Sequence, residues 1–238
     1  MRFLVTRPQP ECRQTADFLR AAGHVADELP LLVMHAQMPE RFDLSDVSAV
    51  AFTSRRAVAL TTEHQQFSDL KQLPVFAVGS ATAKVCEEAG FQSIKFAEDG
   101  VASLGQLILD SQEGLAPGCV LYPAAQERAG DLEGILEVGN VQCRPVITYR
   151  MDRLGVLPDE IARALDAKAI DGALIFSKRT ADTLVSLIKK TGLEHIFSDL
   201  SVYAISRQAA EPLSMYMKVR VADMPCQSAL LDLVLADC

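Results

Sequence analysis

Residues 49–56 read Ala-Val-Ala-Phe-Thr-Ser-Arg-Arg, a short apolar strand pattern that ends in two hydroxyls and two cations. A helical pattern follows and leads to a second strand that ends in glycine, Val75-Phe76-Ala77-Val78-Gly79. The same order returns later, where residues 172–179 read Gly-Ala-Leu-Ile-Phe-Ser-Lys-Arg and residues 202–206 form the next strand pattern. Two copies of one strand–helix–strand unit predict that the chain folds as two similar α/β halves.

The composition is that of a chain that buries apolar cores and carries a net negative charge. Of the 238 residues, 49% are hydrophobic, and the mean hydropathy is +0.15. The net charge of −8 argues against nucleic acid as the main partner. The longest apolar run, residues 229–236, contains Asp232 and is far shorter than the roughly 20 residues of a membrane span. Because the first residues show no secretory pattern, we expect no membrane partner and a cytoplasmic location.

The cysteines and histidines show no spacing that is typical of a disulfide framework or a metal site. The six cysteines lie at positions 12, 86, 119, 143, 226 and 238 and form no C-x-x-C motif. The four histidines, at positions 24, 35, 64 and 195, form no H-x-x-x-H pair. We therefore expect reduced thiols in a reducing compartment and no bound metal.

Strands and helices alternate along the whole chain. The apolar patterns predict further strands at 3–6, 93–97, 119–123, 141–149 and 218–222. They predict further helices near 103–110, 158–168 and 227–235, and one that starts at Pro8, a residue that suits a first helical turn. Gly23, Gly90, Gly139 and Gly192 each follow a helical pattern, where a left-handed residue closes a helix. Continuous apolar strands between helices predict parallel sheets that are covered on both faces.

Two long extended segments interrupt this alternation and predict where the domains join. Asp27–Gln37 contains Pro30, and Val141–Asp152 contains Pro145. Proline fits an edge or connecting strand and not a central one. We therefore predict a discontinuous α/β domain, residues 1–34 and 152–238, with a second α/β domain, residues 38–146, inserted into it. Residues 35–37 and 147–151 form a two-stranded linker in this interpretation.

Hydroxyls and cations gather at the predicted carboxyl ends of the strands, where open α/β sheets bind ligands. They are Thr6-Arg7, Thr53-Ser54-Arg55-Arg56, Ser80, Thr82, Arg128, Ser177-Lys178-Arg179 and Ser206-Arg207. Helix N-capping explains any single serine or threonine best. The cations are harder to explain, since a positive charge at a helix N-terminus opposes the macrodipole by about 0.3–1 kcal/mol. The pattern indicates a ligand with several carboxylates or phosphates.

The motifs of nucleotide-binding proteins and hydrolases are absent from the sequence. There is no G-x-x-x-x-G-K-[ST], and residues 78–83 lack the second and third glycines of a dinucleotide-binding turn. No predicted strand end carries a cluster of aspartates for magnesium, and there is no G-x-S-x-G, Ser/His/Asp or Cys/His set. These absences argue against a P-loop enzyme, a phospho-receiver domain and a serine or cysteine hydrolase.

Tyr149 is the remaining candidate for catalysis. It lies at the end of the second predicted linker strand, at the mouth of a cleft between the predicted domains. A phenol is a weak acid that can donate a proton to a departing oxygen. The alternative is a hinge tyrosine that packs and hydrogen-bonds locally, and spacing alone favours that alternative.

Five segments, taken in their order and spacing, carry a family resemblance. They are Leu4-Val5-Thr6-Arg7-Pro8, Phe52-Thr53-Ser54-Arg55-Arg56-Ala57-Val58, Ala77-Val78-Gly79-Ser80-Ala81-Thr82-Ala83, Tyr122-Pro123 with Arg128 downstream, and Val146-Ile147-Thr148-Tyr149. With these segments the whole chain resembles the uroporphyrinogen-III synthase family. The resemblance implies a monomer with two flavodoxin-like domains, joined by a two-stranded linker, and an active site in the cleft between them.

The resemblance also implies a reaction. The family consists of lyases of haem biosynthesis that act on hydroxymethylbilane, a linear tetrapyrrole with eight carboxylates. The substrate loses its hydroxyl as water, ring D attacks through its substituted carbon, and the macrocycle closes with that ring inverted to give uroporphyrinogen III. No cofactor or metal is needed, because the task of the protein is mainly to orient the substrate against the easier uninverted closure.

By this resemblance, Tyr149 is expected to assist the departure of the hydroxyl. The residues expected to bind the substrate are Arg7, Thr53, Ser54, Ser80, Thr82, Arg128, Ser177, Lys178 and Ser206. The later copy departs from the family pattern, since residues 204–210 read Ala-Ile-Ser-Arg-Gln-Ala-Ala where the family commonly has a glycine followed by threonines. This departure keeps a second hypothesis open, a non-catalytic two-domain binder of an anionic small molecule on the same scaffold.

Overall fold

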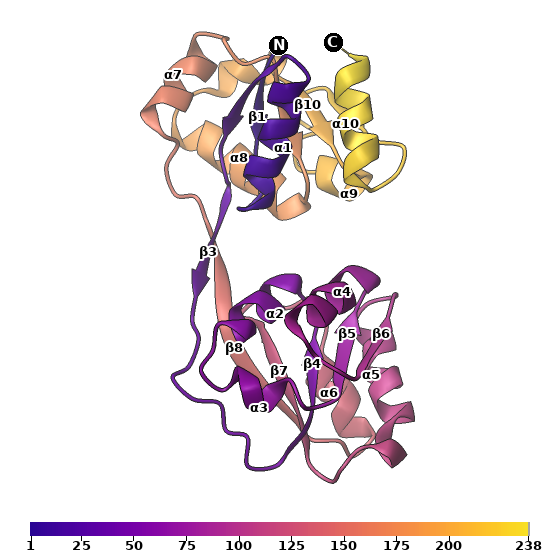
Figure 1. Cartoon of the computed structure of the whole chain (residues 1–238). Coiled ribbons are helices and arrows are strands. Elements are labelled where there is room, and N and C mark those ends of the chain that lie inside the picture. The colour runs from indigo at the N-terminus through magenta and orange to yellow at the C-terminus, as the bar shows by residue number, and fades with distance from the viewer. Residues whose placement is uncertain (238) are drawn as a thin grey trace. The chain divides into compact units, whose positions relative to one another are not determined.

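The computed structural model describes residues 1–237, and the chain divides into two compact units (Figure 1). Unit 1 comprises Met1–Met34 and Asp152–Cys238, and unit 2 comprises His35–Met151. Cys238, the sixth cysteine and the last residue of the predicted discontinuous domain, lies outside the described residues. Each unit has a largely parallel sheet with helices on its faces, so the predicted α/β fold class is confirmed.

Unit 1 is built on a five-stranded parallel sheet in the order β11-β10-β9-β1-β2. Its strands are β1 (Arg2–Val5), β2 (Val25–Glu28), β9 (Gly172–Ile175), β10 (Ser201–Ala204) and β11 (Val219–Val221). Its α-helices are α1 (Glu11–Ala21), α7 (Asp159–Asp166), α8 (Lys178–Lys190), α9 (Arg207–Ala210) and α10 (Gln227–Ala236). From β1 the chain adds β2 on one side and later returns to the other side of β1, which is the flavodoxin-like order.

Alternate residues of the central strands of unit 1 face two separate apolar cores. Phe3 and Val5 pack with α1 and α10, whereas Leu4 packs with α7 and α8. This follows from the pleat of a strand, in which successive side chains point to opposite faces. Helices therefore cover both faces of the sheet, which explains why the strand sequences are apolar without interruption.

Unit 2 contains a six-stranded sheet in the order β3-β8-β7-β4-β5-β6. Its strands are β3 (Leu32–Ala36), β4 (Val47–Phe52), β5 (Val75–Val78), β6 (Ile94–Ala97), β7 (Cys119–Ala125) and β8 (Cys143–Arg153). Its α-helices are α2 (Arg55–Thr62), α3 (Phe67–Leu70), α4 (Ser80–Ala89), α5 (Val101–Asp110) and α6 (Leu132–Val138). Strands β4 to β8 are parallel, and two short 3-10 helices, at Gln112–Gly114 and Glu194–Ser198, complete the two units.

The pleat of β4 also separates two cores in unit 2. Val50 and Phe52 lie in the core that α2 and α4 cover, together with Tyr149 from β8. Ala49 and Ala51 lie in the core that α5 and α6 cover, together with Tyr122 from β7. The two tyrosines therefore belong to opposite faces of one sheet.

Strands β3 and β8 cross the boundary between the units and run antiparallel. Their backbone bonds join Gln37 to Thr148 at 2.8 Å and Leu154 to Leu31 at 2.9 Å. The sequence predicted one extended segment over Asp27–Gln37, and this is wrong, because β2 ends at Glu28 and β3 begins only at Leu32. The break coincides with Pro30, which has no backbone N–H to continue a ladder.

Two predicted helix ends also differ from the structure. Helix α1 begins at Glu11 with Pro10 before it, and not in the turn that contains Pro8. Gly23, Gly90 and Gly192 do take the predicted left-handed conformation, with φ of 87°, 95° and 70°. At the end of α6, however, Gly139 has a φ of −89°, and Asn140 takes the left-handed conformation with a φ of 57°. Asparagine is one of the few other residues that visit this region readily.

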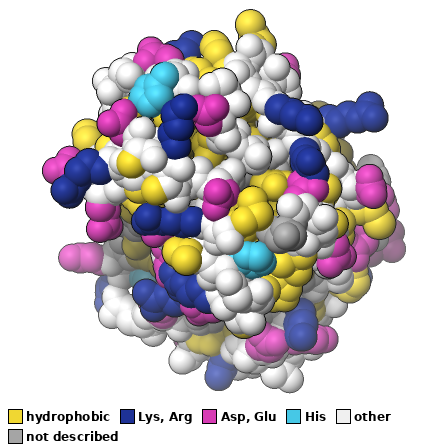
Figure 2. All heavy atoms as spheres, turned by 90° about the horizontal axis from the view of Figure 1, so that it is seen from above, with side chains coloured by type: hydrophobic (Ala, Val, Ile, Leu, Met, Phe, Trp, Pro, Cys, Tyr) yellow, Lys and Arg dark blue, Asp and Glu magenta, His cyan; other side chains and the backbone are white. Residues whose placement is uncertain are grey.

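The surface carries charges of both signs. On the face that Figure 2 shows, Lys and Arg side chains lie interspersed with Asp and Glu, and neither sign forms a continuous field. Within residues 1–237, no helix has both the length and the apolar character that a membrane span requires.

Candidate functional site

The carboxyl ends of β4 and β7 mark the point where the connections of the unit 2 sheet reverse direction. From β4 the chain adds β5 and β6 on one side and then returns to place β7 on the other side. Ligands bind at such switch points in open α/β sheets. A pocket of about 290 Å³ opens here, which we call the β4–β7 pocket. It is lined by Thr53, Ser54, Val78, Gly100, Val101, Ala125, Glu127, Arg128, Ala129 and Tyr149.

Ser54 and Tyr149 form a hydrogen-bonded pair in the wall of the β4–β7 pocket. Their hydroxyl oxygens lie 2.9 Å apart, and either one can donate. Ser54 also caps α2, because its Oγ accepts a bond from the backbone N–H of Arg56 at 3.1 Å. Tyr149 is 6% exposed and is packed in the core that α2 and α4 cover. Packing and one hydrogen bond thus fix the position of the phenol at the edge of the pocket.

The place of Tyr149 along its strand differs from the expectation. It lies within β8 and not at its end, since β8 continues to Arg153 beside β3. The sequence suggested a tyrosine at an open mouth, whereas Tyr149 is only 6% exposed and lines the β4–β7 pocket. Tyr149 therefore has the local packing expected of a structural hinge tyrosine, and it also has a pocket beside its hydroxyl.

Thr53 and Tyr122 form a second hydroxyl pair on the opposite face of the sheet. The Oγ1 of Thr53 lies 3.0 Å from the phenol oxygen of Tyr122, a residue that is 1% exposed. Burial raises the pKa of the Tyr122 phenol, although the bond to Thr53 and the charge of Arg128 act in the other direction. Tyr122 therefore remains a neutral hydrogen-bond partner. Its ring also makes a cation–π contact with Arg128, whose guanidinium carbon lies 5.7 Å from the ring centroid.

Two helices begin beside the β4–β7 pocket with glycine in place of a capping side chain. Gly79 precedes α4 with a φ of 79°, and Gly100 precedes α5 with a φ of 86°. These positive φ values are readily taken only by glycine. The first N–H groups of a helix have no intrahelical acceptor and attract anions. Because Gly100 and Val101 line the pocket, the start of α5 forms part of its wall.

The two hydroxyl residues predicted on α4 are placed differently from each other. Ser80 is exposed, whereas Thr82 is only 6% exposed, and its backbone N–H bonds to the carbonyl of Gly79 at 3.1 Å. Neither belongs to the residues that line the β4–β7 pocket, to which this part of the chain contributes Val78.

In unit 1, Arg7 lies at the corresponding switch point, between the carboxyl ends of β1 and β9. Its guanidinium carbon is 4.3 Å from the ring centroid of Phe176. Its Nη1 donates to the side-chain oxygen of Gln227 and, at 3.4 Å, to the Oγ1 of Thr15. The arginine is therefore oriented by contacts within unit 1.

The other predicted residues of unit 1 are held by local bonds. Ser177 and Ser206 cap α8 and α9 by accepting bonds at 3.2 Å from the backbone N–H groups of Thr180 and Ala209. With Ser54, three of the predicted hydroxyls are N-caps, so the capping interpretation is confirmed for them. Lys178 donates to the carboxylate of Glu211 at 2.7 Å, and this bond raises the pKa of the lysine.

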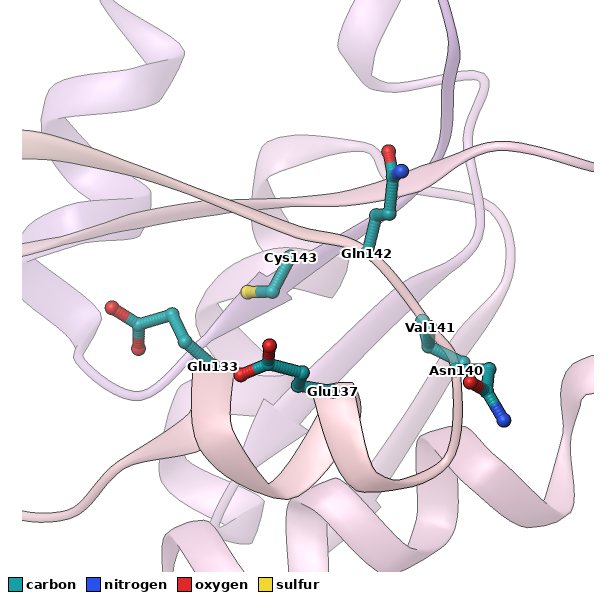
Figure 3. A pocket seen from close by; sticks show the side chains of 6 residues that line it. All are labelled: Glu133, Glu137, Asn140, Val141, Gln142 and Cys143. Carbon is teal, nitrogen blue, oxygen red and sulfur yellow. The ribbon is translucent and has the colours of Figure 1, made fainter.

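A larger recess of about 470 Å³ lies along α6 and the start of β8 (Figure 3). It is lined by Glu133, Glu137, Asn140, Val141, Gln142 and Cys143. Burial, followed by the charge of Glu133, raises the pKa of the Cys143 thiol to about 12. Two carboxylates and a neutral thiol make this recess a poor site for a polyanion. The β4–β7 pocket is the better candidate.

Sequence reasoning did not identify every residue of the site. Tyr122 was noted only as part of a motif, and Gly100 was not singled out. The bond between Thr53 and Tyr122 depends on the register of β4 against β7, which shifts between Val47 and Ala49 and which the sequence does not specify. Within residues 1–237, no group of three or more His, Cys, Asp or Glu side chains is placed to hold a metal ion.

Comparisons with known proteins relate both the fold and the sequence to one family. A family model described as uroporphyrinogen-III synthase HemD matches residues 13–232. Uroporphyrinogen-III synthetase from Helicobacter pylori aligns over 100% of this chain and 99% of its own, with a TM-score of 0.67 and 19% identity. A mutant uroporphyrinogen III synthase from Thermus thermophilus aligns over 99% and 98%, with a TM-score of 0.60 and 16% identity. No match was found among the curated proteins. At these identities the solved structures show a shared fold, and the family match covers most of the chain.

Proposed function

Since the chain belongs to the uroporphyrinogen-III synthase family, whose members are lyases of tetrapyrrole biosynthesis, we propose that it uses the β4–β7 pocket to cyclise hydroxymethylbilane to uroporphyrinogen III. The family match confirms the resemblance drawn from the sequence.

The observation that carries the proposal is the pairing of Tyr149 with Ser54 beside Arg128. One wall of the pocket holds a phenol that can donate a proton, and the same pocket holds a cation that can bind a carboxylate. A reaction that expels a hydroxyl from a polycarboxylate needs both groups in one place. Neither the recess along α6 nor the recess around Ser206 and Asp223 contains a tyrosine.

The hydrogen bonds of Ser54 determine how the proton of Tyr149 can be used. The Oγ of Ser54 already accepts the N–H of Arg56, and it carries one hydrogen of its own. When Ser54 donates that hydrogen to the phenol oxygen, the proton of Tyr149 can point into the pocket. Tyr149 then transfers this proton to the departing hydroxyl as the carbon–oxygen bond breaks, and water leaves. The resulting phenolate accepts the hydrogen bond from Ser54, which stabilises its charge.

The pocket is suited to one end of the substrate. Its volume of about 290 Å³ lies at the lower limit of the roughly 300–1,000 Å³ of small-molecule sites. We propose that it holds the end that carries the hydroxyl, with a neighbouring acetate or propionate on Arg128 and on the N–H groups at the start of α5. Thr53 and Ser54 supply the nearby hydroxyls.

We further propose supporting roles for the residues that lie outside this pocket. Ser80 and Thr82, at the start of α4, bind carboxylates through the first turn of that helix. In unit 1, Arg7, Ser177, Lys178 and Ser206 bind others. Their position after the carboxyl ends of β1, β9 and β10 supports this assignment. The residues proposed for the chemistry are side chains of the chain itself, and no cofactor is part of the proposal.

We propose that the protein acts as a monomer in the cytoplasm. Cys12, Cys86, Cys119, Cys143 and Cys226 are free thiols, as expected in a reducing compartment. Large exposed apolar side chains are scattered over several elements, among them Phe18 on α1, Phe96 on β6 and Val138 on α6. Scattered single residues of this kind do not require a partner surface.

A turnover experiment distinguishes catalysis from simple binding. Hydroxymethylbilane is supplied in a large molar excess over the protein, and its consumption is followed against a sample without protein. We expect the protein to accelerate the consumption of many equivalents. A non-catalytic binder would protect at most one equivalent and leave the rest to react at the spontaneous rate, and that result would contradict the proposal.

A further inference from the structure

The guanidinium of Arg128 already holds a carboxylate of the protein. Its Nη1 donates to the Oε1 of Glu133, which lies in the first turn of α6. Both side chains are 27% exposed, so the ion pair lies at the surface and is open to exchange. Chemically, the side chain of Glu133 is a propionate, the same group that the proposed substrate carries. Glu133 therefore occupies Arg128 with the same chemical group that the substrate would offer.

We propose that Glu133 is an internal competitor for the substrate carboxylate at Arg128, and that it thereby sets the affinity of the pocket. This inference rests on the proposed function, in which Arg128 binds a carboxylate of the substrate. Binding then exchanges one carboxylate for another at the guanidinium. The gain in binding free energy is therefore smaller than it would be at an arginine that holds no carboxylate. Removing the charge of Glu133 increases that gain.

The surroundings of Glu133 allow the exchange. Glu133 lies in the first turn of α6, where the helix macrodipole favours a carboxylate whether or not Arg128 is bound to it. Its side chain also faces the open recess along α6, where water can solvate it; Figure 3 shows it projecting from the same helix as Glu137. The released carboxylate is therefore not left buried and unpaired, a situation that would make the exchange costly.

The second proposed cation is arranged in the same way. Lys178 donates to Glu211 at 2.7 Å in unit 1, with side-chain exposures of 47% and 65%. This pair is more exposed than the pair of Arg128 and Glu133, so it is screened more by solvent. We therefore expect the same kind of competition there with a smaller effect, and Arg128 is the better place for a test.

A positioning role for Glu133 makes a different prediction. If Glu133 mainly orients Arg128 through its hydrogen bond, a substitution that keeps the bond leaves KM unchanged, and one that loses the bond raises KM. If Glu133 competes, its loss lowers KM. Glu133→Gln separates the two roles well, because the amide oxygen still accepts a bond from Arg128 while the charge is gone.

The test compares Glu133→Gln with Glu137→Gln, which removes the same charge one turn further along α6. For Glu133→Gln we expect KM for hydroxymethylbilane to fall about two- to fivefold relative to wild type, the range of an exposed ion pair, with a smaller change in kcat. Glu137→Gln reports the general effect of lost negative charge, and we expect it to change KM much less. A KM that rises or stays unchanged in Glu133→Gln, or that falls equally in both variants, would overturn the inference.

A binding measurement keeps the inference separate from the proposed reaction. The dissociation constant of uroporphyrin III, a stable octacarboxylate, is measured by titration for wild type, Glu133→Gln, Arg128→Gln and the double variant. We expect Glu133→Gln to tighten binding in the wild-type background and to have no effect once Arg128 is glutamine. An equal effect in both backgrounds would contradict the inference, whereas a protein that binds in this pattern but does not turn over would contradict only the proposed reaction.

Discussion

Tyr149 and Tyr122 present the same phenol in two settings of one sheet. Each is hydrogen-bonded to a hydroxyl from the turn after β4, Ser54 in one case and Thr53 in the other. Tyr149 lines the β4–β7 pocket, whereas Tyr122 is buried beneath Arg128 and does not line it. The two residues therefore form a matched pair for separating catalysis from support.

Replacing Tyr149 by phenylalanine tests its proposed role as proton donor. We expect Tyr149→Phe to lower kcat by at least about 10²-fold, the lower end of the range for general acid catalysis. Tyr122→Phe loses an equivalent hydrogen bond but no proton donor, so we expect a much smaller loss. Steady-state kinetics on both variants, with thermal unfolding as a check of folding, makes the comparison. Equal losses in the two variants would return Tyr149 to a packing role.

The thiols of the chain differ in reactivity because their surroundings differ. Burial raises the pKa of Cys12, Cys86 and Cys143 to about 12. Bonds from Ser228 and from the backbone N–H of Ala229 lower the pKa of Cys226, which is only half-buried at the start of α10. The thiolate is the reactive form of cysteine. Near neutral pH a larger fraction of Cys226 than of those other three cysteines is in this form.

We expect Cys226 to be alkylated first among the five described cysteines when the native protein is treated with iodoacetamide at about pH 8. Mass spectrometry of the digested protein gives the order of modification. Ser228→Ala removes the bond from the hydroxyl and should slow the reaction of Cys226 alone. If Cys12 or Cys86 reacts as fast as Cys226 in the folded protein, the assigned burial is wrong.

At the scale of single residues, the sequence identified chemistry better than contacts. Thr53, Ser54, Arg128 and Tyr149, which line the pocket, were all named from the sequence, because each follows or ends a predicted strand. The partners of these residues were not found. A hydroxyl pair across a sheet depends on strand register, and an ion pair such as that of Arg128 with Glu133 depends on how a loop of a few residues bends.

The helices that follow the strands begin in two different ways, and the difference bears on the site. Three helices, α2, α8 and α9, are capped by the serine that follows the preceding strand. Two others, α4 and α5, start at a glycine with positive φ and have no capping side chain. In unit 2 the uncapped start of α5 lies at the pocket, so its first N–H groups are the ones offered to an anion.

Ser177 shows how a capping role can be told from a binding role. It caps α8, whose 13 residues make it the longest helix of the described chain. We expect Ser177→Ala to lower the free energy of unfolding by about 1 kcal/mol, and Ser177→Asp to preserve it. Urea unfolding followed by circular dichroism measures both.

The kinetics of the same two variants complete that test. If Ser177 only caps the helix, Ser177→Asp leaves KM near the wild-type value. If it also binds a substrate carboxylate, as we propose, the added negative charge raises KM while stability is kept. An unchanged KM in Ser177→Asp would remove Ser177 from the proposed site.

The kind of most strands and longer helices was predictable, but some of their ends were not. Apolar runs between glycines located the strands, because strands covered on both faces are apolar without interruption. The predicted ends of helices were wrong where either of two nearby residues suited the end position. Pro8 and Pro10 both suit a helix start, and Gly139 and Asn140 both suit a left-handed end. The choice depends on how the chain leaves the neighbouring strand, which is a tertiary effect.

At the scale of the whole molecule, the domain boundaries that the sequence suggested remain a proposal. The predicted linker segments, residues 35–37 and 147–151, belong to the stretch where β3 and β8 pair. The compact units of the structure divide between Met34 and His35 and between Met151 and Asp152. The repeated strand–helix unit predicted two halves, but it did not predict that the two sheets differ in strand order.

The difference in strand order bears on function. Unit 1 has the order 2-1-3-4-5 in its own strands, and in unit 2 the strands β4 to β8 follow the order 3-2-1-4-5 with β3 added at the edge. Both orders place a switch point beside the first strand of the repeat. In unit 2 that point holds the β4–β7 pocket, and in unit 1 it holds Arg7 over Phe176. The changed residues at 206–210 of the later copy fall at α9, outside the pocket that carries the proposed chemistry.

Closure of hydroxymethylbilane with ring D inverted is the activity that we propose for this chain. The most direct measurement separates the type I and type III isomers formed from hydroxymethylbilane in the presence of the wild-type protein. We expect mainly the type III isomer, formed faster than the spontaneous closure and in amounts far above one equivalent of protein. Type I isomer alone, formed at the spontaneous rate, would contradict this proposal.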